Sequence, residues 1–140
     1  MNLSFELLQE KDIPQIREIV ESFMEYDHEQ IKAFLSEKHN IVLVAKLDNG
    51  VIGLIYGYSL ARLDKRLPQF FMYSVDIHPV YQNKGYGSQF VKFAVDWARE
   101  NGFSESYVPV YKDNAPACRV YEKAGMKHDG KDCREYVIEY

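Results

Sequence analysis

Tyr81-Gln82-Asn83-Lys84-Gly85-Tyr86-Gly87-Ser88 is the stretch that decides the fold, because it joins an expected strand to an expected helix. The strand, Phe70 to Ile77, is rich in aromatic and β-branched residues. The helix, about Gly85 to Glu100, has apolar residues at helical spacing and ends at Asn101-Gly102. The two glycines in the junction let the backbone turn tightly and approach a ligand closely.

A junction of this kind favours the binding of phosphate groups. The first amides of a helix have no partner within the helix, and the helix dipole adds positive potential there, so a pyrophosphate binds readily. Lys84 and the Ser88 hydroxyl offer further donors. No Walker sequence is present, and a Rossmann fingerprint fits poorly, because its third glycine would fall at Phe90.

Upstream of the junction, the pattern predicts two helices and a hairpin. Helical spacing predicts a first helix from Asp12, as N-cap, to about Tyr26, and a second short helix around Phe34. The strand-like runs Ile41 to Leu47 and Val51 to Ala61 flank the turn residues Asp48-Asn49-Gly50, which predicts a hairpin.

Downstream, the pattern predicts a strand, a helix and a last strand over Ser106 to Tyr111, Ala115 to Ala124 and Arg134 to Tyr140. The strand–helix–strand unit around the junction predicts two parallel strands. Together these elements predict an α/β fold, a mixed central sheet with helices on its faces. The apolar C-terminal strand would be an exposed edge unless it is paired, so we expect a homodimer.

Two motifs carry a resemblance to a known family. Gln82 to Gly87 matches the [QR]-x-x-G-x-[GA] signature of GNAT acetyltransferases, and Val75 to Pro79 resembles the run that precedes it in that family. Asn114 to Met126 resembles the family's N-x-x-A-x-x-x-Y-x-K-x-G-F segment, with Met in place of Phe. The resemblance covers about Phe70 to Met126 and implies a GNAT-like sheet with splayed parallel strands that form an acetyl-CoA cleft.

The resemblance also implies which residues bind acetyl-CoA. The backbone of Val75 and Ile77 would pair with the pantetheine arm, and an amide near Val75 would polarise the thioester carbonyl. Gly87 is expected to lie against the pyrophosphate, with no room for a Cβ. The remaining expected contacts to acetyl-CoA are Gln82, Asn83, Lys84, Gly85, Tyr86, Ser88 and Asn114.

Direct acyl transfer to an amine needs an acid near the leaving thiolate and a base for the amine proton. Tyr121 is the candidate acid, because a phenol is protonated at neutral pH. The family often has an acidic residue where this chain has Tyr73 and Ser74, so Asp76 is the candidate base, acting through water. Strand alternation places Asp76 on the face opposite Val75 and Ile77. A role for His78 as base is the weaker interpretation.

The acceptor side carries acidic residues. Glu25 and Asp27 lie where the first helices of the family meet the acceptor cleft, and they would attract a cationic amine. A solvated acidic surface remains the alternative.

Length and composition exclude several classes. The 140 residues predict one domain, 1–140. The net charge of −4 without a basic tract argues against a nucleic-acid partner, and the aromatic run Phe70, Phe71 and Tyr73 then indicates core packing. Neither a signal peptide nor an apolar run long enough for a membrane span is visible, and the thiols of Cys118 and Cys133 read as reduced, so we expect a cytoplasmic protein. The spacing of histidines and cysteines predicts no metal site.

The sequence therefore predicts an N-acetyltransferase that moves the acetyl group of acetyl-CoA to a primary amine of a small molecule or peptide. An aminoglycoside N-acetyltransferase-like resistance enzyme is the alternative within this class. A non-catalytic CoA-binding module and a nucleotide-binding domain of another fold are the rivals outside it.

Overall fold

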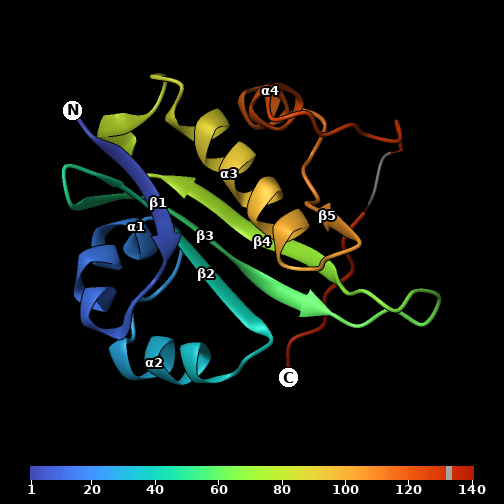
Figure 1. Ribbon diagram of the computed structural model, residues 1–140, viewed down its shortest axis with the longest axis horizontal. Helices are drawn as coiled ribbons and strands as arrows, with labels where there is room; N and C mark the ends of the chain where they lie inside the picture. The colour runs from blue at the N-terminus through green and yellow to red at the C-terminus, as the bar shows by residue number, and fades with distance from the viewer. Residues whose placement is uncertain (132–133) are drawn as a thin grey trace.

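A five-stranded sheet forms the centre of the computed structural model, which describes residues 1–131 and 134–140 (Figure 1). Its strands follow one another in chain order and are β1 (Leu3–Leu7), β2 (Asn40–Leu47), β3 (Gly50–Leu60), β4 (Gln69–Ile77) and β5 (Glu105–Tyr107). Neighbours from β1 to β4 are antiparallel, and β4 and β5 are parallel. The predicted hairpin and the predicted parallel pair are both confirmed.

Helices cover both faces of this sheet (Figure 1). One face carries α3 (Tyr86–Glu100) and α4 (Ala115–Lys123), close to their predicted bounds. The other carries the 3₁₀ helix η1 (Glu10–Ile16), α1 (Arg17–Glu21) and α2 (His28–Ser36). A short 3₁₀ helix, η2 (Pro79–Tyr81), links β4 to α3. Within the described ranges, none of the helices has the length and apolar character needed to cross a membrane.

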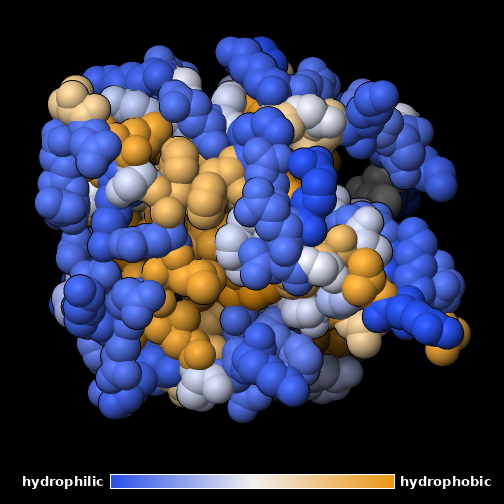
Figure 2. Space-filling model, viewed as in Figure 1, coloured by the Kyte–Doolittle hydropathy of each residue, from blue (hydrophilic) through white to orange (hydrophobic). Residues whose placement is uncertain are grey.

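Two apolar cores result, one on each face. In β2, Leu43 and Ala45 pack toward α3 and its Phe90, whereas Val42 and Val44 pack toward η1 and α1. This explains why β2 is an uninterrupted apolar run, because a strand covered on both faces shows no alternation. In the face drawn in Figure 2, apolar side chains gather near the middle and hydrophilic ones surround them.

A β-bulge changes the phase of β4 in its middle. Met72 pairs with Gly57 and Ser74 pairs with Tyr56, so Tyr73 is an extra residue with no partner of its own. The strands approach so closely here that a Cβ on Gly57 would collide with the Phe71 carbonyl. Such a bulge bends the strand and re-aims the side chains beyond it.

Beyond the bulge, Val75 and Ile77 pack into the core under α3, and Asp76 lies on the other face, near Tyr56. The predicted orientation of Asp76 relative to its two neighbours is therefore confirmed. The bulge itself was not predicted, because the sequence of one strand does not show where its pairing with the neighbouring strand skips a residue.

The N-terminal predictions were partly wrong. Leu3–Leu7 forms the edge strand β1, which was missed, and the expected first helix is a 3₁₀ turn followed by a single short α-helix. Asp12 is not its N-cap but a buried residue inside η1, where its carboxylate accepts from Lys46 at 3.1 Å and from Gln15 at 3.0 Å. The Asp12 carboxylate therefore pairs with Lys46, which is distant in the sequence, instead of capping a helix.

The C-terminal predictions gave too much β-strand. The strand expected over Ser106 to Tyr111 is only β5, since Pro109 lacks the N–H that a ladder needs. Residues 134–140 form no strand; they are irregular and exposed, with Tyr136 88% and Val137 77% accessible. A β-rich segment without a neighbouring strand gains nothing from extended pairing, so the edge that motivated a homodimer is absent from the described chain. Cys133 lies outside the described residues.

Removing the Asp12 carboxylate tests this N-terminal packing. We expect Asp12→Ala to lower the free energy of unfolding by about 1–3 kcal/mol, because the largely buried Lys46 ammonium loses Asp12 and keeps Glu6, and Gln15 loses its acceptor. Urea denaturation measures the change. Asp12→Asn keeps an acceptor oxygen and is the control that should lose less; equal losses in both variants would contradict the hydrogen-bond explanation.

Candidate active site

The opening of the sheet between β4 and β5 is the first feature of the candidate site. The two strands pair only where Gln69–Phe71 faces Glu105–Tyr107. Beyond this point β5 ends, while β4 continues to Ile77. On that side, the backbone of β4 from Tyr73 onward has no strand partner in the described chain. The sheet is therefore open beside the second half of β4, where the splayed parallel pair was expected.

The glycine-containing turn leads from the end of β4 into α3. Asn83 and Gly85 have positive φ angles of 62° and 83°, and Gly85 is the N-cap of α3 without a capping side chain. The Gln82 side chain donates to the Ile77 carbonyl at 2.8 Å and so ties the turn to the strand. Lys84 is exposed. The turn thus presents backbone amides and one free cation, a combination that suits a phosphate.

The two glycines in this turn have different reasons to be glycine. A Cβ on Gly85 would be strained by its positive φ, whereas Gly87 has an ordinary backbone conformation. A Cβ on Gly87 would point into the protein, toward Val120 at 3.5 Å and Ile77 at 3.8 Å, which are ordinary contacts. The expectation that Gly87 has no room for a Cβ is therefore wrong. The position that requires glycine is Gly85.

Helix α4 carries Tyr121 on the face of the sheet that α3 also covers. The Asn114 side chain caps this helix by accepting from the Ala117 amide at 3.3 Å. Tyr121 is partly buried against the core under α3. Burial, with smaller contributions from Asp76 and Cys118, raises the pKa of Tyr121 to about 12. Its phenol is therefore a proton donor at any physiological pH.

Asp76 is electrostatically coupled to phenols from two elements. Burial raises the pKa of its carboxyl group, and a hydrogen bond from the Ser74 hydroxyl opposes that shift. The Asp76 charge in turn contributes to the raised pKa of Tyr121 on α4 and to that of Tyr56 on β3, which burial raises to about 12. The Asp76 carboxylate therefore lies close enough to influence both the Tyr121 phenol on α4 and the Tyr56 phenol on β3.

His78 already has partners on both ring nitrogens. Its Nε2 lies 3.0 Å from a Glu18 carboxylate oxygen, and its Nδ1 accepts from the Val80 amide at 3.3 Å. The ring therefore fastens the start of η2 to α1. This favours a structural role over a catalytic one.

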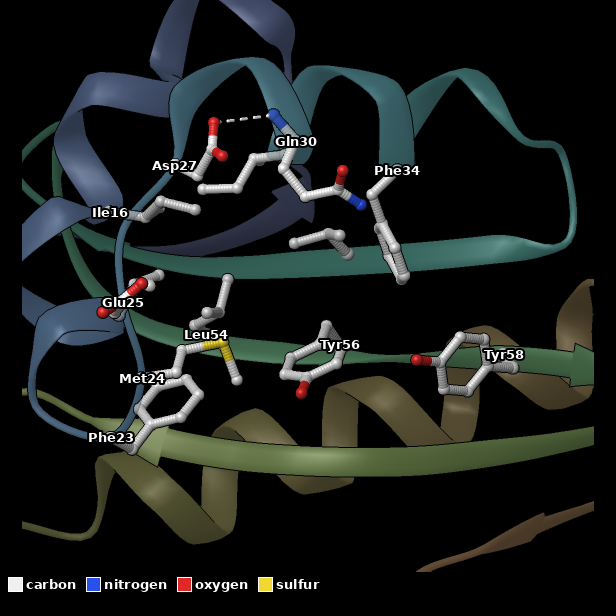
Figure 3. A pocket seen from close by; sticks show the side chains of 13 residues that line it. Ile16, Phe23, Met24, Glu25, Asp27, Gln30, Phe34, Leu54, Tyr56 and Tyr58 are labelled. Atoms are coloured by element: carbon white, nitrogen blue, oxygen red, sulfur yellow. Dashed lines mark hydrogen bonds between the residues drawn. The ribbon is translucent and has the colours of Figure 1, made fainter. Parts of the chain in front are cut away.

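A pocket of about 260 Å³ lies on the face of the sheet that carries α1 and α2 (Figure 3). The predicted acceptor residues Glu25 and Asp27 both line it. The Asp27 carboxylate accepts from the Gln30 amide at 3.1 Å and so caps α2 (Figure 3). The Glu25 side chain is exposed, and Figure 3 draws no hydrogen bond between it and the other lining residues. The other lining residues are mostly apolar or aromatic: Ile16, Val20, Phe23, Met24, Gln30, Ile31, Phe34, Val42, Leu54, Tyr56 and Tyr58.

The aromatic wall of this pocket was missed in the sequence. Tyr56 contributes to the wall, and its ring centroid lies 5.4 Å from that of Tyr73 and 5.9 Å from that of Phe34. Tyr58 lies 6.1 Å from Tyr73. Of the aromatic run on β4, Phe70 is core as expected, but Tyr73 is 59% exposed, which corrects the core-packing interpretation for that residue. Tyr56 and Tyr58, two positions apart in β3, could have indicated this wall, because alternate residues of a strand share one face.

Comparisons with known structures agree with this fold. A solved aminoglycoside acetyltransferase from an uncultured soil metagenomic sample superposes with a TM-score of 0.87 at 23% identity, covering 99% of this chain and 97% of that one. The structure of AAC(6')-Iy with a bisubstrate analogue, CoA-S-monomethyl-acetylneamine, superposes with a TM-score of 0.77 at 16% identity, covering 100% and 97%. At these identities the likeness shows the fold.

Sequence comparison carries the assignment. The chain is 26% identical over 87 residues to the streptothricin acetyltransferase of Streptomyces lavendulae, a match that covers 62% of this chain and 46% of that protein. The chain thus spans less than half the length of this relative. The model of the Acetyltransferase (GNAT) family matches residues 6–126, which include the turn, Asp76, Tyr121 and the pocket. The chain belongs to the GNAT acetyltransferase family.

Proposed function

We propose that the protein transfers the acetyl group of acetyl-CoA to a primary amine by direct attack. The observation that carries the proposal is the opening between β4 and β5, with the amide-rich turn at one end and the Asp76–Tyr121 pair beside it. Family membership supports acetyl-CoA as the donor. The amides of the turn and Lys84 would hold the pyrophosphate, and the free backbone of β4 would pair with the pantetheine arm.

In the reaction the amine nitrogen bonds to the thioester carbon, and the carbon–sulfur bond breaks. An amide near Val75 would stabilise the negative charge on the carbonyl oxygen. The Tyr121 pKa of about 12 lies above the value of about 8.5 for an ordinary thiol. Complete proton transfer from Tyr121 to the thiolate is therefore uphill. Tyr121 acts as a hydrogen-bond donor to the developing thiolate, which takes its final proton from water.

The amine reaches the thioester from the pocket side, where Asp76 accepts the proton that the nitrogen loses, through a water molecule. Its raised pKa makes Asp76 a stronger base than an exposed aspartate. Ser74 stands where the family often has an acid, and its hydroxyl donates to Asp76, so it holds this carboxylate in place.

Asp76→Asn distinguishes the proposed catalytic role of this carboxylate from its effect on stability. Burial raises the folded-state pKa, so the charged carboxylate costs stability at neutral pH, and that cost vanishes below the ordinary pKa of 3.8. We expect the melting temperature of the variant to equal or exceed that of the wild type at neutral pH, with the gap closing toward about pH 4. We expect kcat to fall about tenfold, less than the roughly 100-fold or more typical of a base in direct contact, because the proton reaches Asp76 through water. Unchanged kcat would remove Asp76 from the mechanism.

The direct test of the function is release of free CoA thiol from acetyl-CoA in the presence of a panel of amines. Saturable acetyl-CoA binding without any acetylated product would instead favour a non-catalytic CoA-binding module. Stabilisation against heat by NAD or ATP, with none by acetyl-CoA, would contradict both. The solved aminoglycoside acetyltransferase and the AAC(6')-Iy complex among the similar structures make aminoglycosides the second candidate class. We retain a homodimer as a prediction for light scattering.

A further inference from the structure

The acceptor pocket is chemically unlike a binding site for a polycation. Among the described residues that line it, carboxylates come from Glu25 and Asp27 alone. One oxygen of the Asp27 carboxylate already accepts from the Gln30 amide as the cap of α2, so the exposed Glu25 is the better placed of the two to bind a ligand cation. An aminoglycoside carries several ammonium groups and many hydroxyls, more than Gln30, Tyr56 and Tyr58 could pair, so part of them would meet apolar side chains.

The same lining suits an amine on an apolar body. Phe23 and Met24 are 37% and 44% exposed at one end of the pocket, and they lie next to Glu25 (Figure 3). Phe34, Tyr56 and Tyr58 line the other part, and their rings meet edge to face, as aromatic rings in a binding wall commonly do. A single ammonium group is also attracted to the faces of such rings.

We propose that the acceptor is a monocationic primary amine on an aromatic or alkyl body, rather than a polycationic aminoglycoside. The inference rests on the proposed function and narrows its substrate class. The apolar body would lie along Phe34, Met24 and Phe23, with the ammonium group held by Glu25 on entry. Attack would follow when the nitrogen, after giving one proton to water, reaches the opening near Tyr56 and Asp76.

Calorimetry with two probes, 2-phenylethylamine and kanamycin, tests the class without relying on turnover. Each probe is titrated into the free protein and into protein saturated with CoA. We expect 2-phenylethylamine to bind at least tenfold more tightly than kanamycin, with little dependence on salt. Equal or tighter binding of kanamycin, or no saturable binding of 2-phenylethylamine in either form, would overturn the proposal.

A matched pair of variants tests the place of binding. Phe23→Lys adds a cation at the pocket, and Leu63→Lys adds the same charge at a fully exposed position in the loop between β3 and β4. We expect at least tenfold weaker binding of 2-phenylethylamine to Phe23→Lys and no change for Leu63→Lys. Equal affinities in the two variants would overturn the assignment to this pocket.

Acetyl-CoA is titrated into the same samples, which keeps the two hypotheses apart. If acetyl-CoA fails to bind while 2-phenylethylamine binds as expected, the proposed transferase function fails and the pocket assignment stands. If acetyl-CoA binds and kanamycin is the tighter-binding amine, the substrate class is wrong, and the thiol-release assay decides the transferase function separately.

Discussion

Tyr121→Phe is expected to lower kcat about 100-fold while the affinity for acetyl-CoA stays within about twofold of the wild type, at the lower end of the range for removing one catalytic donor. The substitution removes only the hydroxyl, so the packing of the ring against the core under α3 remains. The loss is confined to the transition state, because the thioester sulfur gains negative charge only as its bond to carbon breaks.

The pH dependence of this variant distinguishes donation from titration. Because the pKa of Tyr121 is about 12, its phenol stays protonated through the range in which rates are measured. The ratio of wild-type to variant kcat should therefore be constant from about pH 6 to pH 9. Tyr26→Phe, which removes a hydroxyl on the opposite face of the sheet, is the control. A ratio that changes tenfold over this range would contradict a donor with so high a pKa.

The parts of the structure that could be predicted are those whose signals are local. The hairpin followed from turn residues between two apolar runs, and α3 and α4 followed from helical spacing with a glycine after each end. The motif around Gly85 identified the family because both its residue types and its place between strand and helix are recognisable without a partner.

The features that were missed depend on contacts between distant segments. Asp12 resembles an N-cap until Lys46, 34 positions away, is brought beside it by β2. The bulge at Tyr73 exists only in the register with β3, and so the exposure of that ring was not visible in β4 alone. The aromatic wall likewise combines Phe34 of α2 with Tyr56 and Tyr58 of β3. Each of these residues is unremarkable in its own segment.

Gly85→Val is expected to weaken the binding of acetyl-CoA at least thirtyfold, equivalent to about 2 kcal/mol. A left-handed conformation costs about 1–2 kcal/mol for a residue with a Cβ, and a β-branched side chain fits it least well. Relief of that strain opens the turn at Gly85, whose φ is 83°, and moves the amides of Asn83 and of the first turn of α3 away from the phosphate oxygens. Calorimetry with acetyl-CoA measures the loss.

Gly102→Val is the matched control, because Gly102 follows the other end of α3 and has a φ of 82° with open space around its Cβ position. Both substitutions place a Cβ at nearly the same positive φ, so the two variants should unfold with similar losses of about 1–2 kcal/mol. Only Gly85→Val changes the phosphate turn, and only this variant should lose affinity for acetyl-CoA. Gly87→Ala should retain affinity, since its Cβ meets Val120 at an ordinary 3.5 Å. Equal affinities in the Gly85 and Gly102 variants would show that the amides of this turn do not hold the pyrophosphate.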